Sequence, residues 1–190
     1  MSNYKLFGLG NALVDLEYVV SDTTLTNLNI EKGQMTLIDK EQSQSLANTS
    51  GLNVHKKSGG GSAANTMIGF SQLGGEGWYS CKVANDDNGN VFLNDLSKEN
   101  IDHNFLNHKK PDGETGTCRV FVTPDGERTM QTYLGITQTF SESELNLEAL
   151  ECSEMIYVEG YLVSSETGFV AAKKALAEAN KSGVKKAMTL

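Results

Sequence analysis

Residues 59–75 read GGGSAANTMIGFSQLGG. Glycines at the start of this stretch allow the backbone to approach a ligand closely, because they carry no side chain. Small and apolar residues from Ala63 to Leu73 then follow helical spacing, and Gly74-Gly75 is typical of a helix end. We therefore predict a helix over residues 63–73 that begins directly after a glycine-rich loop.

A glycine-rich loop before a helix is a candidate ligand-binding element. The helix N-terminus offers free N–H donors and a partial positive charge. The loop is not a Walker loop, because no Gly-Lys-Ser/Thr follows, and it is not the G-x-G-x-x-G fingerprint of dinucleotide binding. The small residues at 62–64 could equally serve close helix–sheet packing. Asn65 is harder to explain by packing, because a buried amide needs partners, either ligand hydroxyls or backbone carbonyls.

Strands and helices alternate along the rest of the chain. Residues 4–9 and 155–158 are apolar runs typical of buried strands, and residues 88–98 and 167–180 have helical spacing. A further strand is expected from Val184 to the last residue. This alternation predicts an α/β fold with a parallel sheet.

Three β-rich pieces do not fit the alternation. They span residues 16–20, 35–38 and 117–133. The last of them contains the turn sequence Pro124-Asp125-Gly126-Glu127, which predicts a β-hairpin. We expect these pieces to form a small separate sheet built from insertions.

Two acids follow buried strands and are candidate ligand-binding residues. Asp15 lies shortly after the first strand, and ligands of open α/β sheets bind beyond the carboxyl ends of strands. Its carboxylate could accept two hydrogen bonds from neighbouring hydroxyls, although a turn or capping role is the alternative. Glu159 ends the strand at 155–158, and we expect it at the rim of the sheet, where a ligand or solvent reaches it.

Composition narrows the class of protein. The 190 residues carry a net charge of −8, which disfavours nucleic-acid binding, because an acidic surface repels the phosphate backbone. No run approaches the roughly 20 apolar residues of a membrane-spanning helix. Three distant cysteines exclude a disulfide framework, and the three histidines form no metal-ligand pattern. The first residues do not resemble a signal peptide, so a cytoplasmic location is expected.

Several of these motifs together resemble one protein family. The run GGSAAN at 60–65, followed by GFSQLG at 69–74, resembles the first signature of the ribokinase-like (PfkB) carbohydrate and nucleoside kinases. The run GNALVD at 10–15 is similar to the first-strand element of that family. The segments TGTC at 115–118 and PDGERTM at 124–130 resemble its lid hairpin, in a version seen near adenosine kinases.

This resemblance implies a three-layer α/β/α core with a small β-sheet lid over the acceptor site. The lid would come from insertions at about 16–38 and 115–134. It also implies a substrate site. Asp15 would bind acceptor hydroxyls, the backbone of Gly60 and Gly61 and the Asn65 amide would hold the sugar, and Glu159 would lie near the sugar or the phosphate channel. Phe121 is a candidate lid residue over the acceptor, with Val120 as the alternative, because alternation alone does not decide which of the two faces inward.

One part of the family pattern is missing from the chain. The second signature, Gly-Ala-Gly-Asp with the catalytic Asp, does not occur in the sequence. We therefore expect an N-terminal portion of a kinase, with no catalytic residue in this chain and the catalytic Asp and nucleotide-binding part beyond Leu190. ATP and Mg²⁺ are expected cofactors of the complete protein.

The function implied is ATP-dependent phosphoryl transfer to a primary hydroxyl of a nucleoside or sugar, adenosine first and ribose-like sugars next. The chain would supply the acceptor-binding half and would be inactive alone. The alternative is a non-catalytic sugar- or nucleoside-binding module that forms a homodimer through the edges of the lid. A Rossmann-type oxidoreductase is disfavoured, because the third glycine after Gly8-x-Gly10 is missing. No metal site, nucleic-acid partner or membrane association is expected.

Overall fold

A parallel sheet forms the centre of the molecule. The structure is a computed structural model that describes residues 4–106 and 108–189. Within them, five strands pair in the order β10-β9-β1-β5-β6, and all the pairs are parallel. We call this the core sheet. Its strands are β1 (Tyr4–Leu9), β5 (Gly77–Ser80), β6 (Ile101–His103), β9 (Ser153–Val158) and β10 (Lys185–Met188).

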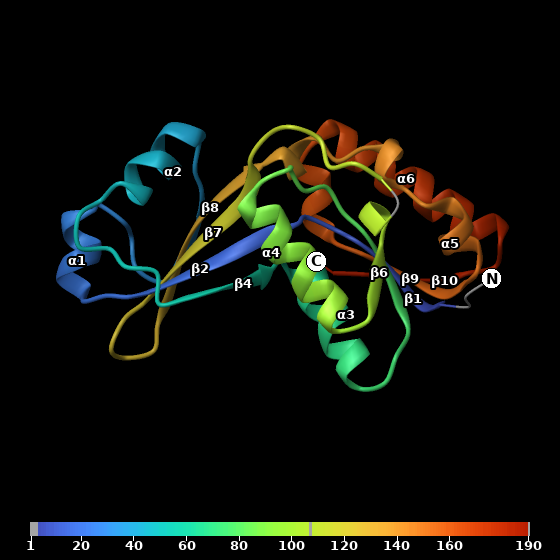
Figure 1. Ribbon diagram of the computed structural model, residues 1–190, viewed down its shortest axis with the longest axis horizontal. Helices are drawn as coiled ribbons and strands as arrows, with labels where there is room; N and C mark the ends of the chain where they lie inside the picture. The colour runs from blue at the N-terminus through green and yellow to red at the C-terminus, as the bar shows by residue number, and fades with distance from the viewer. Residues whose placement is uncertain (1–3, 107, 190) are drawn as a thin grey trace.

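A second sheet extends from one side of the core (Figure 1). Its strand order is β3-β8-β7-β2-β4. The β7/β8 and β2/β4 pairs are antiparallel, whereas β2/β7 and β3/β8 are parallel, so the sheet is mixed. Its strands are β2 (Leu13–Val19), β3 (Met35–Leu37), β4 (Lys56–Gly60), β7 (Thr115–Val122) and β8 (Arg128–Gly135).

Successive residues of a strand point to opposite sides of the sheet. Both sides of the core sheet carry apolar side chains, and helices cover both. On one side Leu6 and Tyr79 pack with Met67 and Phe92 from the helices α3 and α4. On the other, Phe7 packs with residues of α5 and α6. The predicted three-layer core is therefore confirmed. The helices are α1 (Asp22–Asn27), α2 (Lys40–Ala47), α3 (Ser62–Gln72), α4 (Asp87–Lys98), α5 (Leu147–Glu151) and α6 (Glu166–Lys181).

The helices α1 and α2 pack on the second sheet (Figure 1). Leu25 of α1 joins a hydrophobic cluster with Tyr18 and Phe121. Ser43 of α2 accepts a hydrogen bond from the buried Arg119. No helix among the described residues combines the length and hydropathy that crossing a bilayer requires.

Local signals in the sequence predict several elements well. The hairpin forms as expected, with Gly126 at φ +83° in its turn. Asp39 caps α2 through a full capping box. The sequence Ser141-Glu142-Ser143-Glu144 has the S-x-x-E pattern that favours a capping box. The box forms, but it caps a 3₁₀ turn, and α5 begins later with Asn146 as its own N-cap.

The elements α1, β4 and β6 are among those that the sequence did not predict. The sequence of β4, KKSGG, has no apolar alternation and few residues that favour strands. It forms a strand because β2 offers an edge with which it pairs from Leu13–Gly60 to Glu17–Lys56. Tertiary pairing here overrides local preference.

Candidate functional site

Asp15 lies on β2, near the junction of the two sheets. It is half-buried and lines a cavity of about 330 Å³. Burial raises the pKa of the Asp15 carboxyl above its usual value, and the nearby charges of Arg128 and Lys56 partly offset this shift. Asp15 is thus a carboxylate that gains from hydrogen-bond donors supplied by a ligand.

The glycine-rich loop lies against Asp15. Gly60 ends β4, and a Cβ atom at this position would lie 2.3 Å from Oδ1 of Asp15. Gly61 follows with φ +97°, a backbone conformation that glycine adopts most readily. The two glycines therefore allow β4 to turn into α3 directly beneath the Asp15 carboxylate.

Asn65 lies in the first turns of α3 and lines the same cavity. It is exposed, so its side-chain amide does not need a buried protein partner and can face a ligand. The structure thus brings Asp15, Gly61 and Asn65 together around one cavity, with Gly60 in contact with Asp15.

Apolar side chains also line this cavity. They come from the second sheet, on strands β2, β3 and β8. The cavity therefore combines polar groups, Asp15 and Asn65 among them, with an apolar lining on the second sheet. The apolar side chains are Leu13, Met35, Leu37, Met130 and Leu134.

Sequence reasoning missed the contribution of β8 to this cavity. Arg128, Met130, Thr132 and Leu134 all line it. They alternate along one strand and so share one face of the sheet. Once the hairpin was predicted, this period of two was the signal that could have identified them.

The other two candidate residues, Glu159 and Phe121, differ in their relation to the cavity. Glu159 is at the cavity wall, but it is only 2% exposed and its oxygens accept hydrogen bonds from Asn11 and Ala63. Phe121 is fully buried on the other face of the second sheet, stacked on Tyr18, and does not line the cavity. The alternation of β7 explains this, because Cys118 and Val120 face the Asp15 side of the sheet.

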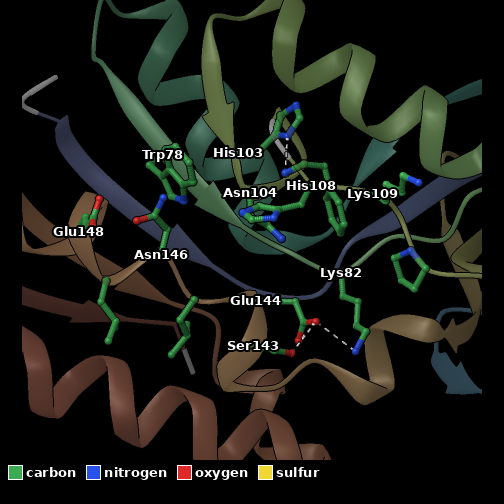
Figure 2. Close-up of a pocket in the computed structure, with 14 residues that line it drawn as sticks. Trp78, Lys82, His103, Asn104, His108, Lys109, Ser143, Glu144, Asn146 and Glu148 are labelled. Carbon is green, nitrogen blue, oxygen red and sulfur yellow. Dashed lines mark hydrogen bonds and ion pairs between the residues drawn. The ribbon is translucent and has the colours of Figure 1, made fainter.

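A larger cavity of about 610 Å³ lies between the end of β5 and the segment at 143–148, and it holds none of the predicted site residues (Figure 2). Two of its polar side chains, Lys82 and Asn104, bond to the protein itself. Lys82 pairs with Glu144 at 3.2 Å and donates to the Thr139 carbonyl at 2.9 Å. Asn104 exchanges hydrogen bonds with the backbone of Cys81. These contacts hold the loops together, so the smaller cavity is the better candidate site.

Comparison with known proteins agrees with this arrangement. A profile of the pfkB family carbohydrate kinases matches residues 32–189, which is most of the chain. The chain belongs to the pfkB kinase family. Kinases of this family use ATP.

Solved structures of pfkB-type kinases resemble the chain over its whole length. An adenosine kinase from Sinorhizobium meliloti superposes with a TM-score of 0.90 at 34% identity. A probable sugar kinase from Rhizobium etli CFN 42 gives a TM-score of 0.89 at 32% identity. In both cases the alignment covers 100% of this chain and 57% of the other. The fold is therefore ribokinase-like.

A curated relative gives the same picture. An adenosine kinase from Schizophyllum commune is 28% identical over 172 residues, which is 86% of this chain and 48% of that protein. The chain spans about half the length of the curated relatives it matches.

The described residues do not form a metal site of their own. In residues 4–106 and 108–189, no three His, Cys, Asp or Glu side chains gather in a way that could hold a metal ion.

Proposed function

We propose that this chain is the acceptor-binding half of an ATP-dependent kinase that phosphorylates a primary hydroxyl of a nucleoside. Adenosine is the first candidate and ribose-like sugars are the next. The carrying observation is that one cavity is lined both by the polar side chains of Asp15 and Asn65 and by apolar side chains of the second sheet. A nucleoside has matching halves, a sugar with hydroxyl donors and a flat, largely apolar base.

The proposed roles follow from the chemistry of each group. The Asp15 carboxylate accepts hydrogen bonds from two acceptor hydroxyls, which compensates its burial. The Asn65 amide both donates and accepts, so it can bind a further hydroxyl. Gly60 and Gly61 let the sugar approach the backbone closely, and Glu159 shapes the floor of the cavity.

The base would lie against the second sheet. Leu13, Met130 and Leu134 present side chains that exclude water from one face of an aromatic ring. A free pentose has no group to fill this part of the cavity. The second sheet would also act as a lid, because water excluded from the acceptor cannot compete for the phosphoryl group. Phe121 is left out of the proposed site because of its position.

The catalytic step is assigned to residues outside this chain. The family's Gly-Ala-Gly-Asp motif does not occur in residues 1–190. We infer that the catalytic Asp and the sites for ATP and Mg²⁺ belong to a nucleotide-binding part beyond Leu190. Residues 1–190 alone would then bind the acceptor without turnover.

Two measurements test this proposal. Calorimetric titration of the 190-residue protein with adenosine, ribose and fructose should show binding, with adenosine the tightest. A coupled assay with Mg·ATP should show no adenosine phosphorylation by residues 1–190 and clear turnover by the protein extended beyond Leu190. Turnover by residues 1–190 would contradict the assignment of a half-site, and binding of none of the three acceptors would contradict the assigned acceptor class.

One observation favours a second candidate, a binding module that dimerises through the second sheet. Its edge strand β3 is short and exposed, with Met35 at 42% and Leu37 at 54% exposure. An unpaired edge with apolar side chains can pair with a second copy. Light scattering that shows a dimer, together with nucleoside binding and no phosphorylation by the extended protein, would support this candidate instead.

A further inference from the structure

A buried hydrogen-bond network lies beneath the candidate site, centred on Glu159. The Oε1 atom of Glu159 accepts from Nδ2 of Asn11 at 2.8 Å and from the Asn11 backbone N–H at 3.3 Å. Its Oε2 atom accepts from the Ala63 backbone N–H at 3.1 Å. These donors come from segments 148 and 96 residues away in the sequence. Both oxygens of the carboxylate are therefore occupied by protein groups.

The network continues from Asn11 to further elements. Oδ1 of Asn11 accepts from the Thr137 hydroxyl at 3.3 Å, and that hydroxyl in turn accepts from the Ala12 N–H at 3.1 Å. The Tyr79 hydroxyl donates to the Asn11 carbonyl at 3.4 Å. Burial, together with the nearby Glu159 charge, raises the pKa of Tyr79 well above its usual value, so this hydroxyl keeps its proton.

These groups lie where the chain passes between the two sheets. Residues 10–12 connect β1 of the core sheet to β2 of the second sheet, and Gly61 connects β4 to α3. Thr137 lies just after β8, where the chain returns to the core. Glu159 itself ends β9 of the core sheet. The Glu159 carboxylate thus bonds two crossings between the core and the second sheet directly, at Asn11 and Ala63, and reaches the third, at Thr137, through Asn11. We call these three crossings the junction.

The junction is packed too tightly for side chains at its glycines. A Cβ at Gly10 would lie 2.7 Å from Oε2 of Glu159, and a Cβ at Gly61 would lie 2.7 Å from the Asn11 carbonyl oxygen. Such distances are shorter than van der Waals contact. The glycines therefore allow the crossings to approach the Glu159 carboxylate.

Glu159 also serves the helix that carries Asn65. The N-cap of α3 is Gly61, which offers no side-chain cap. Glu159 supplies the missing acceptor from outside the helix, through the Ala63 N–H in the first turn. A carboxylate at a helix N-terminus is also favoured by the helix dipole.

We propose that Glu159 is a positioning residue that holds the junction so that Asp15 on the second sheet and Asn65 on the core helix face the same ligand. This role differs from direct binding of the acceptor. Its link to acceptor affinity rests on the proposed function, whereas its effect on the junction does not.

The test is a swap of the two partners at the 2.8 Å contact. In Glu159→Gln the new amide presents a donor to a donor, at either Asn11 or Ala63, so one hydrogen bond is lost. In Asn11→Asp two carboxylates face each other. In the double variant Glu159→Gln/Asn11→Asp, the Gln amide can donate to the Asp carboxylate while its oxygen still accepts from Ala63. The 2.8 Å contact is thus restored with donor and acceptor reversed, and only the longer bond from the Asn11 backbone N–H, at 3.3 Å, is lost.

Hydrogen–deuterium exchange of the full 190-residue protein reports on the junction directly. Each single variant should exchange at least about tenfold faster at residues 10–12, 61–64 and 136–139, and the double variant should recover most of the protection. Adenosine affinity, measured by calorimetry, should fall about tenfold in the Glu159→Gln variant and recover in the double variant. Recovery distinguishes positioning from general destabilisation.

A matched control is Glu144→Gln, at a carboxylate that pairs with Lys82 away from the junction (Figure 2). It should leave exchange at residues 10–12 and 61–64 unchanged; residues 136–139 are not part of this comparison, because Lys82 also donates to the Thr139 carbonyl. Unchanged exchange in Glu159→Gln, or a double variant no better than the singles, overturns the proposal. If the exchange pattern is as expected but the wild-type protein binds neither adenosine nor ribose, the junction role stands and the proposed function fails.

Discussion

The Asp15 carboxylate lies directly against Gly60, so closely that a Cβ atom at Gly60 would be 2.3 Å from Oδ1 and 2.6 Å from Oδ2. Two segments meet in this contact, the β2 strand that carries the acid and the loop that opens α3. The position of the carboxylate therefore depends on the absence of a side chain at residue 60.

A Gly60→Ala substitution should displace the Asp15 side chain. The added methyl overlaps the carboxylate, and relief of such overpacking costs about 1–3 kcal/mol. We expect acceptor affinity to fall at least about tenfold, measured by calorimetric titration with adenosine.

The matched control is Gly69→Ala, on α3, where a Cβ would meet nothing within 4 Å. It should keep the affinity and stabilise the helix by up to about 1 kcal/mol. Equal affinity in both variants would show that Asp15 is not constrained by Gly60.

The raised pKa of Asp15 predicts a pH dependence of binding. Burial is the main cause of this shift, so the charged form is less favourable in the folded protein than in the unfolded chain. Acceptor binding should use the charged form and should weaken as the pH falls through the raised pKa. Calorimetry from pH 4 to pH 8 measures this. Asp15→Asn should bind weakly and with little pH dependence, and an unchanged affinity in this variant would remove Asp15 from the site.

The same shift predicts how Asp15→Asn changes stability. A carboxyl whose pKa is higher in the folded protein than in the unfolded chain lowers the free energy of unfolding above the unfolded pKa. The reason is that ionising it costs more free energy in the folded state. The penalty grows with pH up to the folded pKa and is absent below the unfolded value of about 3.9. Asp15→Asn should therefore melt at a higher temperature than the wild type at pH 7, and the gain should vanish below about pH 4. A variant less stable at pH 7 would contradict the sign of the shift.

Local patterns were enough to predict much of the fold. The helix expected at 63–73 forms at 62–72, because the glycines on both sides mark its ends. The strand β4 was missed, because its sequence KKSGG has no strand signal and its pairing depends on the edge of β2. Strand pairing between distant segments is information that local propensity does not contain.

The candidate site shows the same division. The glycine loop, Asp15 and Asn65 were predicted from short motifs, and the structure gathers Asp15, Gly61 and Asn65 at one cavity. The partners of Glu159 were not predicted, because the Asn11 contact joins residues 148 positions apart. No periodicity or motif reports such a contact, which exists only after both sheets have formed.

The apolar side chains that line the cavity predict which acceptor binds more tightly. Met130→Ser removes apolar surface beside the proposed base and should weaken adenosine binding about tenfold, whereas ribose binding should change little. The control is Met188→Ser on β10, where the side chain is 54% exposed and does not line the cavity. Competition calorimetry with both ligands measures the difference. Equal losses for adenosine and ribose would place the base elsewhere.

Arg119 predicts a stability effect on the far face of the second sheet. It is 5% exposed, its Nη1 atom donates to the Ser43 hydroxyl at 2.8 Å, and its Nε atom has no hydrogen-bond partner among the described residues. Ser43→Ala should cost about 1–3 kcal/mol, because it leaves another buried donor unsatisfied. Arg119→Met should be at least as stable as the wild type, because it removes a buried charge whose identified partners are neutral hydroxyls.

Urea unfolding measures the stability of both variants. The control is Ser45→Ala on the exposed side of α2, expected within about 0.5 kcal/mol of the wild type. In the Arg119→Met background, Ser43→Ala should lose most of its cost, since the donor it served is gone. A full cost in that background would show that Ser43 stabilises α2 independently of Arg119.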